Sequence, residues 1–568
     1  MALRRALSAL ALLLLRTPDA DACGCFTPPD PSVPVVQAGE RITFALEDGK
    51  VVSHIQIQYS GPAQEFGWLL PLPTQPEPLE LGTDELFAQL ISTTQPKYVL
   101  QRQYVGDCPF DPSRGGGFGP SSGGDSADPE DPSPDSPLVL MDSVGPYDYA
   151  ILRADSKQPM LDWLTTNGFF VPAGTDATVD AYIRPNAYFL ALKLRKGQDT
   201  GDLQPVVVRY QSELPMIPIV LTSVAADPNM PIMVWMLGDA RAIPRNYNHT
   251  VINDAKIDWV NFGANYIDVI TEAVNDAEGG RAFVTEYAGP SSIMVDLLDY
   301  TGRFGNAADL ASLTDAVQYV QYLSGAGYGV YNSQTFALQF PTPLINLLQR
   351  ELPEPAGLVD QGVTANDYYT NIGWWLGWYK DTYPELYTDL DVTFDPVQLT
   401  DDIQQRIVAP TLAAGKMFRD HPYMTRLFTT LSPQEMTRDP VFSFNPDLPQ
   451  VSNVHTGTIT YFCGPFGTQA PQGEVPARVV TEDGWRLDMA TGTDNSIWAD
   501  VDMPASRYTQ VLREEGDPEV VWDRSGEIAD AIGGDPWAGG CAIGARGGLS
   551  ALALVGLAGL VIVRRRRS

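Results

Sequence analysis

The chain has 568 residues, of which 44% are hydrophobic and 19% are charged, and its formal net charge at pH 7 is −33. This apolar content is too high for a chain that is disordered overall, and the length fits two or three domains. A surface this acidic repels nucleic acid and anionic lipid, so nucleic-acid binding is excluded as a function. Calcium or basic partners remain compatible with the charge, and a solvated acidic surface is the favoured interpretation.

Residues 1–22 are predicted to be a secretory signal peptide. Arg4 and Arg5 provide a positive start, and residues 6–15 form an apolar run that is too short to span a bilayer. Ala20 and Ala22 place small residues at the two positions that a signal peptidase reads, which allows cleavage before Cys23. A lipoprotein signal is the alternative, because a cysteine follows the cleavage site. Either signal places the body of the protein outside the cytoplasm.

Residues 23–360 are predicted to form an α+β domain, because strand and helix patterns follow one another without a regular β-α alternation. Thr83 is expected to cap a helix that Pro96 ends. The turn at 47–49 joins the first two strands into a hairpin. Strands are predicted from alternating or continuous apolar runs at 41–47, 51–59, 66–72, 98–104, 188–194, 206–210, 219–225 and 232–237.

Residues 109–136 interrupt this domain with a run of Pro, Gly, Ser and Asp, which predicts a disordered loop. Two longer helices follow it. Asn265 is expected to cap the first, and Leu310 to Leu323 form the apolar stripe of the second.

Residues 361–463 are predicted to continue the domain as a mostly helical part, with a helix at 400–417. This part holds an aromatic cluster beside the polar run 366–370. The helical spacing of the tryptophans favours a place in the core, and stacking on sugar rings or on a peptide is the alternative. The cluster consists of Trp374, Trp375, Trp378 and Tyr379.

The C-terminal part begins with a β-rich segment at 464–530 and a glycine-containing stalk at 531–548, which includes Cys541. Residues 549–563 form an apolar run, and residues 564–568 add four arginines and a serine. An apolar run that ends in arginines predicts a single transmembrane helix with a cytoplasmic basic tail. The predicted fold class is therefore an α+β ectodomain with a smaller β-rich C-terminal part and one C-terminal transmembrane helix.

Four cysteines remain when Cys541 is set aside, and an even number in an oxidising compartment suggests two disulfides. Cys23 and Cys25 are too close in the sequence to bridge easily, so each is predicted to bond separately to Cys108 or Cys463. Zinc is the alternative, but the chain has no Cys-x-x-Cys pair. No cofactor or metal is expected.

Catalytic motifs are missing from the sequence. There is no His-Glu-x-x-His and no phosphate-binding loop, and the Gly-x-Ser-x-Gly match at 119–123 falls in the predicted loop. Three histidines, His249, His421 and His455, are the candidates for a metal or general-base site built from distant residues. Structural or surface roles for these histidines are the favoured interpretation.

Two parts of the chain resemble known families. The order of Cys541, a short apolar run and an arginine cluster resembles the MYXO-CTERM sorting tail of myxobacteria, which implies a membrane protease that cuts at Cys541 and display at the cell surface. Residues 23–460 resemble the DUF2330 family of exported bacterial proteins, which implies no activity. Motifs that carry this second resemblance are Ala22-Cys23-Gly24-Cys25-Phe26, Phe66-Gly67-Trp68-Leu69-Leu70-Pro71-Leu72-Pro73, Arg241-Ala242-Ile243-Pro244 and residues 37–41, 54–59, 283–289 and 423–433.

The sequence therefore predicts a non-enzymatic binding or structural protein of the cell envelope, anchored in the membrane and displayed at the surface. Its partner is expected to be an envelope polysaccharide or protein. The alternatives are a secreted hydrolase that uses the three histidines and a carbohydrate-binding surface module. The module predicts a change in tryptophan fluorescence when cell-wall polysaccharide is added.

Overall fold

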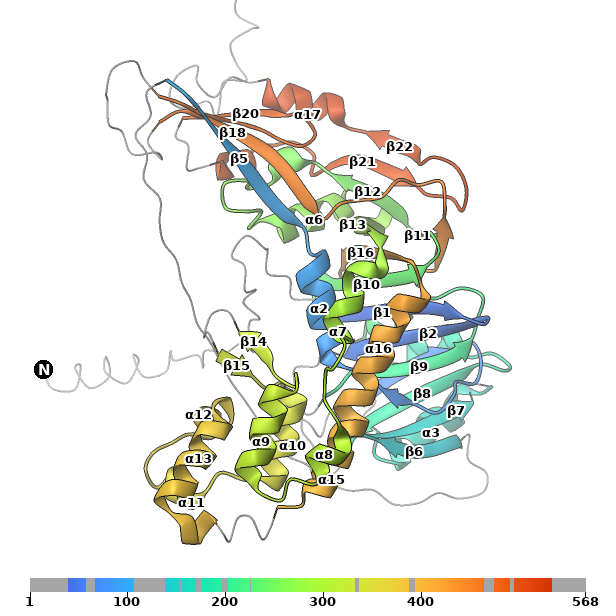
Figure 1. The fold of residues 1–568 in the computed structure, drawn as a ribbon. Coiled ribbons are helices and arrows are strands. Elements are labelled where there is room, and N and C mark those ends of the chain that lie inside the picture. The colour runs from blue at the N-terminus through green and yellow to red at the C-terminus, as the bar shows by residue number, and fades with distance from the viewer. Residues whose placement is uncertain are drawn as a thin grey trace, which may run out of the picture.

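The computed structural model describes residues 39–57, 67–106, 138–153, 155–169, 175–195, 203–224, 226–332, 337–387, 394–463, 475–490 and 495–533. These residues form a mixed α+β structure around one large sheet, as Figure 1 shows. The α+β class agrees with the expectation from the sequence.

The central sheet has ten strands, and its two middle strands come from distant parts of the chain. Most neighbours are antiparallel, but the pairs β1–β10 and β12–β13 are parallel. In spatial order the strands are β22 (Glu519–Asp523), β21 (Ser506–Val511), β12 (Asn248–Ile252), β13 (Ala282–Pro290), β16 (Tyr423–Leu431), β10 (Met230–Gly238), β1 (Glu40–Glu47), β2 (Lys50–Ile57), β9 (Val206–Gln211) and β4 (Glu80–Leu81).

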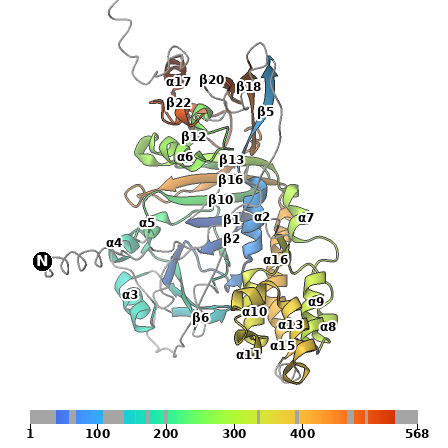
Figure 2. The ribbon, with the colours of Figure 1, turned by 90° about the vertical axis from the view of Figure 1, so that its left-hand side faces the viewer.

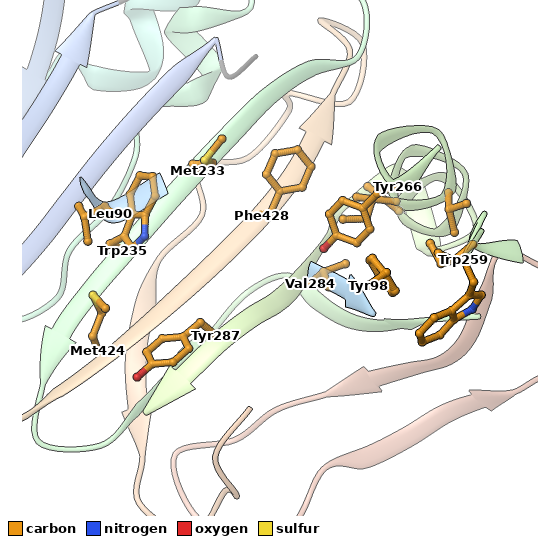
Figure 3. Packing of buried hydrophobic residues seen from close by; sticks show 14 of the residues in the cluster. Leu90, Tyr98, Met233, Trp235, Trp259, Tyr266, Val284, Tyr287, Met424 and Phe428 are labelled. Atoms are coloured by element: carbon orange, nitrogen blue, oxygen red, sulfur yellow. The ribbon is translucent and has the colours of Figure 1, made fainter. Parts of the chain in front are cut away.

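Helices cover one face of this sheet, which Figure 2 shows in side view. Because neighbouring residues of a strand point to opposite faces, each strand sends alternate side chains under these helices. Trp235, Met424 and Phe428 belong to the core on this face, which Figure 3 shows from close by. The helices that pack there are α2 (Asp84–Thr94), α6 (Tyr266–Asn275), α7 (Val295–Leu298) and α16 (Ala409–Asp420).

A four-stranded antiparallel sheet packs against the opposite face of the central sheet. Phe44, Val234 and Leu427 of the central sheet share a buried core there with Tyr149 and Leu190 of the second sheet. The helices α3 (Lys157–Thr166), α4 (Thr175–Val179) and α5 (Ile219–Thr222) lie beside it. The order of this sheet is β3 (Gly67–Leu72), β8 (Tyr188–Leu194), β7 (Tyr147–Arg153) and β6 (Leu138–Val144).

The strands of the predicted β-rich segment do not form a sheet of their own. β21 and β22 extend the central sheet, whereas β19 and β20 join a second four-stranded sheet with β5 and β18. β18 pairs in parallel with β5 along nine residues, although the two strands lie far apart in the sequence. This sheet has the order β20 (Arg486–Met489), β19 (Ala477–Val480), β18 (Val454–Phe462) and β5 (Lys97–Val105). A small two-stranded sheet pairs β11 (Arg241–Pro244) with β17 (Phe442–Asn445).

A helical unit with its own apolar core occupies the region between residues 304 and 408. β14 (Val330–Asn332) and β15 (Ala337–Gln339) form a hairpin beside it. Its helices are α8 (Ala307–Ala311), α9 (Ala316–Gly325), α10 (Thr342–Glu351), α11 (Ala356–Val359), α12 (Ala365–Thr370), α13 (Ile372–Thr382) and α15 (Pro396–Ile403), which continues through a π-turn at Gln404–Val408 into α16.

Local sequence signals predicted several element ends, and two of these predictions need correction. Thr83 caps α2 by accepting a hydrogen bond from the backbone of Glu85, as expected. Asn265 precedes α6 but does not cap it, because its side chain instead bonds the backbone of Asp258 and Lys256. The helix expected over Leu310 to Leu323 is two helices, α8 and α9, since Asp315 caps a new start.

The predicted transmembrane helix requires a correction. Among the residues that the structure describes, no helix is long and apolar enough to cross a membrane. The predicted fold class was therefore right about the α+β body and wrong about the transmembrane helix. Several predicted features lie outside the described residues: the signal peptide, the loop at 109–136, the cysteines 23, 25, 108 and 541, and residues 534–568.

Cys463 is disulfide-bonded, and its position predicts its partner. It follows β18, where Phe462 pairs with Val105, and its backbone N–H donates to the carbonyl of Val105 at 2.8 Å. Cys108 comes three residues after Val105 in the sequence, so the chain between them is long enough to bring Cys108 to Cys463.

We therefore expect non-reducing peptide mapping to recover a peptide that links Cys463 to Cys108. The pairing predicted from the sequence instead bonds Cys463 to Cys23 or Cys25. A peptide that links Cys463 to residue 23 or 25 would support that pairing and exclude the one inferred from the strand register.

Candidate functional site

The structure does not bring the three candidate histidines together. His249 on β12 is buried, with its ring nitrogens 3.0 Å from the Thr285 hydroxyl and 3.2 Å from the Gln510 amide oxygen. His421 follows α16, and its Nε2 atom lies 3.9 Å from a carboxylate oxygen of Glu47.

His455 has different partners again. On β18 it stacks over Tyr98 at 4.8 Å between ring centroids and pairs with Glu482 at 2.8 Å. Burial lowers the pKa of His249 to about 3, with the charge of Arg241 as a second cause, so this histidine is neutral in the folded protein. In the described part of the chain, no group of three or more His, Cys, Asp or Glu could hold a metal ion. The geometry therefore gives no support to the hydrolase alternative.

The aromatic cluster on α13 is only partly in the core. Tyr379 is buried, whereas Trp375 and Trp378 are half-buried and Trp374 is 61% exposed. The buried stripe of this helix is Ile372, Leu376 and Tyr379, at a spacing of four and three residues. The prediction that the tryptophans belong to the core was wrong for Trp374, because that residue lies outside this stripe.

A buried ionic network lies under α2 and α6, and no sequence motif indicated it. The side chains of Arg426 and Glu286 are each 0% exposed and form an ion pair. Tyr266 donates its hydroxyl to Glu286 at 2.8 Å, and Arg426 lies over the ring of Trp235 at 5.3 Å.

A β-bulge explains how Glu286 reaches this arginine. Thr285 and Tyr287 pair with two consecutive residues of β16, so Glu286 is an extra residue with no partner across the ladder. Because both charged side chains are fully enclosed, no ligand can reach them in this state. We assign the network a structural role.

Another candidate site is an acidic cleft between α6 and α17 (Ser525–Ile532). Its volume is about 870 Å³, which is in the range of small-ligand sites, roughly 300–1,000 Å³. Carboxylates are the only charged groups among the residues that line it. These residues are Glu272, Asn275, Asp276, Asp502, Met503, Pro504, Ala505, Glu527, Asp530 and Ala531.

Each wall of the acidic cleft is fixed by contacts behind it. Ile528 is fully buried and anchors α17, while the other face of this helix presents Glu527 and Asp530. The backbone N–H of Asn253 donates to the carbonyl of Ala505 at 2.7 Å, and its amide donates to the carbonyl of Pro504 at 2.9 Å. These contacts hold the loop that forms the floor.

Two cations partly neutralise the acidic cleft. Lys256 pairs with Glu272 at 2.5 Å, and Arg524 pairs with Asp276 at 2.9 Å. No ion pair of the described residues involves the other three lining carboxylates, so the cleft keeps an excess of negative charge. The last turn of α6 adds the negative end of the helix dipole. The lining carboxylates without a described ion pair are Asp502, Glu527 and Asp530.

The sequence alone could not reveal this cleft. Glu272 on α6 and Asp276, which caps the end of that helix, lie four residues apart, and Glu527 and Asp530 lie three apart on α17, so each pair shares a helix face. More than two hundred residues separate the two helices in the sequence, and the pairing of β21 with β12 brings them together. The one available signal was the acidic composition.

Comparisons with known proteins confirm the resemblance to the DUF2330 family, but they do not show the MYXO-CTERM tail. A family model described as "Uncharacterized protein conserved in bacteria (DUF2330)" matches residues 17–406. No curated protein and no solved structure matches the chain.

Proposed function

We propose a function from the premise that the chain belongs to the DUF2330 family, whose description assigns no activity. The protein is a non-enzymatic binding protein that takes a positively charged ligand in the acidic cleft. The observation that carries this proposal is a cleft of about 870 Å³ whose charged lining groups are all carboxylates. A cation that enters it exchanges water for several carboxylate oxygens.

The ligand class follows from the shape and charge of the acidic cleft. The lining carboxylates come from three chain segments, so an extended ligand with more than one cationic group matches them better than a single ion does. A basic peptide segment or a polyamine has this chemistry. The net charge of −33 would also attract such a ligand toward the protein.

Export to the cell envelope is part of the same proposal. It is supported by the basic start and short apolar run of residues 1–22. Processing at Cys541 and display at the surface also stay proposals, which rest on the order of residues in the tail. A surface-exposed binding protein would meet basic proteins or amines of the envelope.

The cleft predicts a measurable binding difference between matched ligands. A peptide of four arginines is expected to bind, whereas the same peptide with neutral citrulline at each position is not. The double variant Glu527→Gln, Asp530→Asn should bind the arginine peptide about tenfold more weakly, because it lacks two carboxylates without a described ion pair. Calorimetry at roughly 0.15 M salt, where long-range attraction is screened, provides the measurement.

The control removes the same charge elsewhere. Asp360 and Glu385 are exposed residues of the helical unit, so Asp360→Asn with Glu385→Gln should leave binding unchanged. Equal weakening in both double variants would show that only the net charge matters. That result would contradict a specific site in the acidic cleft.

The carbohydrate-binding alternative depends on Trp374. It is the tryptophan of the cluster with an open face, and its ring meets that of Trp375 nearly at a right angle, at 80°. Stacking on sugars uses an exposed ring face, which this residue offers. A single exposed ring carries less of an argument than the lined acidic cleft, so we keep this function second.

A further inference from the structure

A short segment beside the acidic cleft holds a buried carboxylate whose contacts extend to both walls. Asp254 lies in a turn of 3₁₀ helix, Asp254–Lys256, and is only 8% exposed. Its carboxylate accepts hydrogen bonds from the hydroxyl of Thr481 at 3.0 Å and from the backbone N–H of Asp483 at 2.9 Å. Asp254 therefore holds the turn that joins β19 to β20.

The same segment supports the α6 side and the floor of the cleft. Asn253, next to Asp254, bonds the carbonyls of Pro504 and Ala505, and Lys256 pairs with the lining residue Glu272. A shift of Asp254 would therefore be transmitted directly to two lining segments.

The held turn also contacts the opposite wall. Asp483 forms an ion pair with Arg507 on β21. The carbonyl of Arg507 accepts the backbone N–H of Arg524 at 3.0 Å, and its Nε atom lies 3.4 Å from the hydroxyl of Ser525. Arg524 and Ser525 begin α17, so the turn is connected to the helix that carries Glu527 and Asp530.

The charged and titratable groups around Asp254 determine how readily its carboxyl ionises. The negative charge of Asp483 repels the Asp254 carboxylate, and His455 on β18 attracts it. Burial and, after it, the charge of Asp254 raise the pKa of Tyr98 on β5. Glu482 belongs to the same turn and is paired with His455. Burial raises the pKa of Asp254 to about 7, with the charge of Asp483 as the second cause, whereas the hydrogen bonds from Asp483 and Thr481 oppose the rise.

We propose that protonation of Asp254 controls the acidic cleft, holding its walls together when the carboxyl is neutral and loosening them when it is charged. This inference rests on the proposed function, because it describes the regulation of that site. The neutral carboxyl keeps both contacts without repelling Asp483, because the protonated oxygen can donate a hydrogen bond to the Thr481 hydroxyl.

The sign of the pH dependence follows from the raised pKa. A folded-state pKa of about 7, above the ordinary value of 3.8, means that the stability contributed by the neutral, buried carboxyl is complete below pH 3.8 and is lost as pH rises through 7. Binding of the arginine peptide should therefore weaken about fivefold between pH 6 and pH 8. Arginine stays protonated throughout this range, so the probe itself does not titrate.

The experiment measures binding of the arginine peptide and backbone hydrogen exchange at pH 6 and pH 8. In the wild-type protein, exchange corrected for the intrinsic pH effect should rise at pH 8 in residues 477–489 and 502–508, together with the loss of affinity. In Asp254→Asn both changes should disappear, because the amide keeps the contacts without a charge.

Two further variants keep the test decisive. Asp439→Asn is the matched control, since Asp439 is also a carboxyl whose pKa burial raises, but it bonds Tyr182 and Val220 far from this segment. It should retain the wild-type pH dependence. If Asp254→Asn does not fold, Asp483→Asn should move the transition to lower pH, because the like charge that faces Asp254 is gone.

The possible failures are distinguishable. Equal affinity at pH 6 and pH 8 in the wild-type protein would overturn the inference and leave the proposed function standing. No binding of the arginine peptide at either pH would overturn the proposed function and this regulation with it. An unshifted transition in Asp483→Asn would also contradict control by Asp254.

Discussion

Replacing Arg426 with Met is expected to lower the free energy of unfolding by about 3–5 kcal/mol, because it leaves Glu286 buried without its cation. Arg426 also donates to the hydroxyl of Thr94 at 3.3 Å and covers the ring of Trp235, so packing is lost together with charge. Urea unfolding of the variant and the wild-type protein measures the difference.

The pH dependence of this variant gives a second check. Burial already raises the pKa of Glu286, and Arg426 opposes that rise. Without Arg426 the carboxyl is held protonated more strongly, so the loss of stability relative to the wild-type protein should grow as pH rises through the raised pKa of Glu286. A loss that stays constant between pH 5 and pH 8 would contradict this account.

A double-mutant cycle separates the ion pair from its surroundings. Adding Glu286→Leu to Arg426→Met removes the uncompensated charge, so the double variant should be more stable than Arg426→Met alone. Additive losses in the two single variants would mean that the two side chains do not interact in the way described.

Replacing Trp259 with Ala is expected to cost about 3–5 kcal/mol of stability. Its side chain is 1% exposed, it packs edge-on against Tyr98 at 5.0 Å, and its ring N–H donates to the carbonyl of Asp254. Thermal or urea unfolding provides the measurement.

Trp374→Ala is the matched control for Trp259→Ala. The residue type and the truncation are the same, but Trp374 is 61% exposed, so its loss should change stability by less than about 1 kcal/mol. A similar loss in both variants would show that exposure does not separate them. The same variant tests the carbohydrate alternative, which requires the fluorescence response to polysaccharide to disappear with Trp374.

The sequence predicted best where one short segment decides the structure. The hairpin of β1 and β2 depends on the alternation of its strands and on the turn at Asp48 and Gly49, both with positive φ. The start of α2 depends on Thr83 and the two acidic residues after it. In such cases the deciding contacts lie within a few residues, so pattern and propensity are sufficient.

The predictions failed where contacts outside the helix or strand itself decide. Asn265 has the chemistry of a cap, yet Asp258 and Lys256 offer its amide better partners. The bulge at Glu286 depends on the register with β16, which lies more than a hundred residues away. The acidic cleft requires α6 and α17 to meet across β21, and no local pattern contains that information.

The position of β16 in the central sheet affects when the chain can fold. β16 lies between β13 and β10, so the strands on either side have no bridge until Tyr423–Leu431 has been synthesised. β5 likewise waits for β18, and contacts at such separations form slowly. Most of the polypeptide is therefore expected to leave the ribosome before its largest sheet can close. For a protein that we propose to be exported, this delay keeps the chain in a form that a secretion channel can thread.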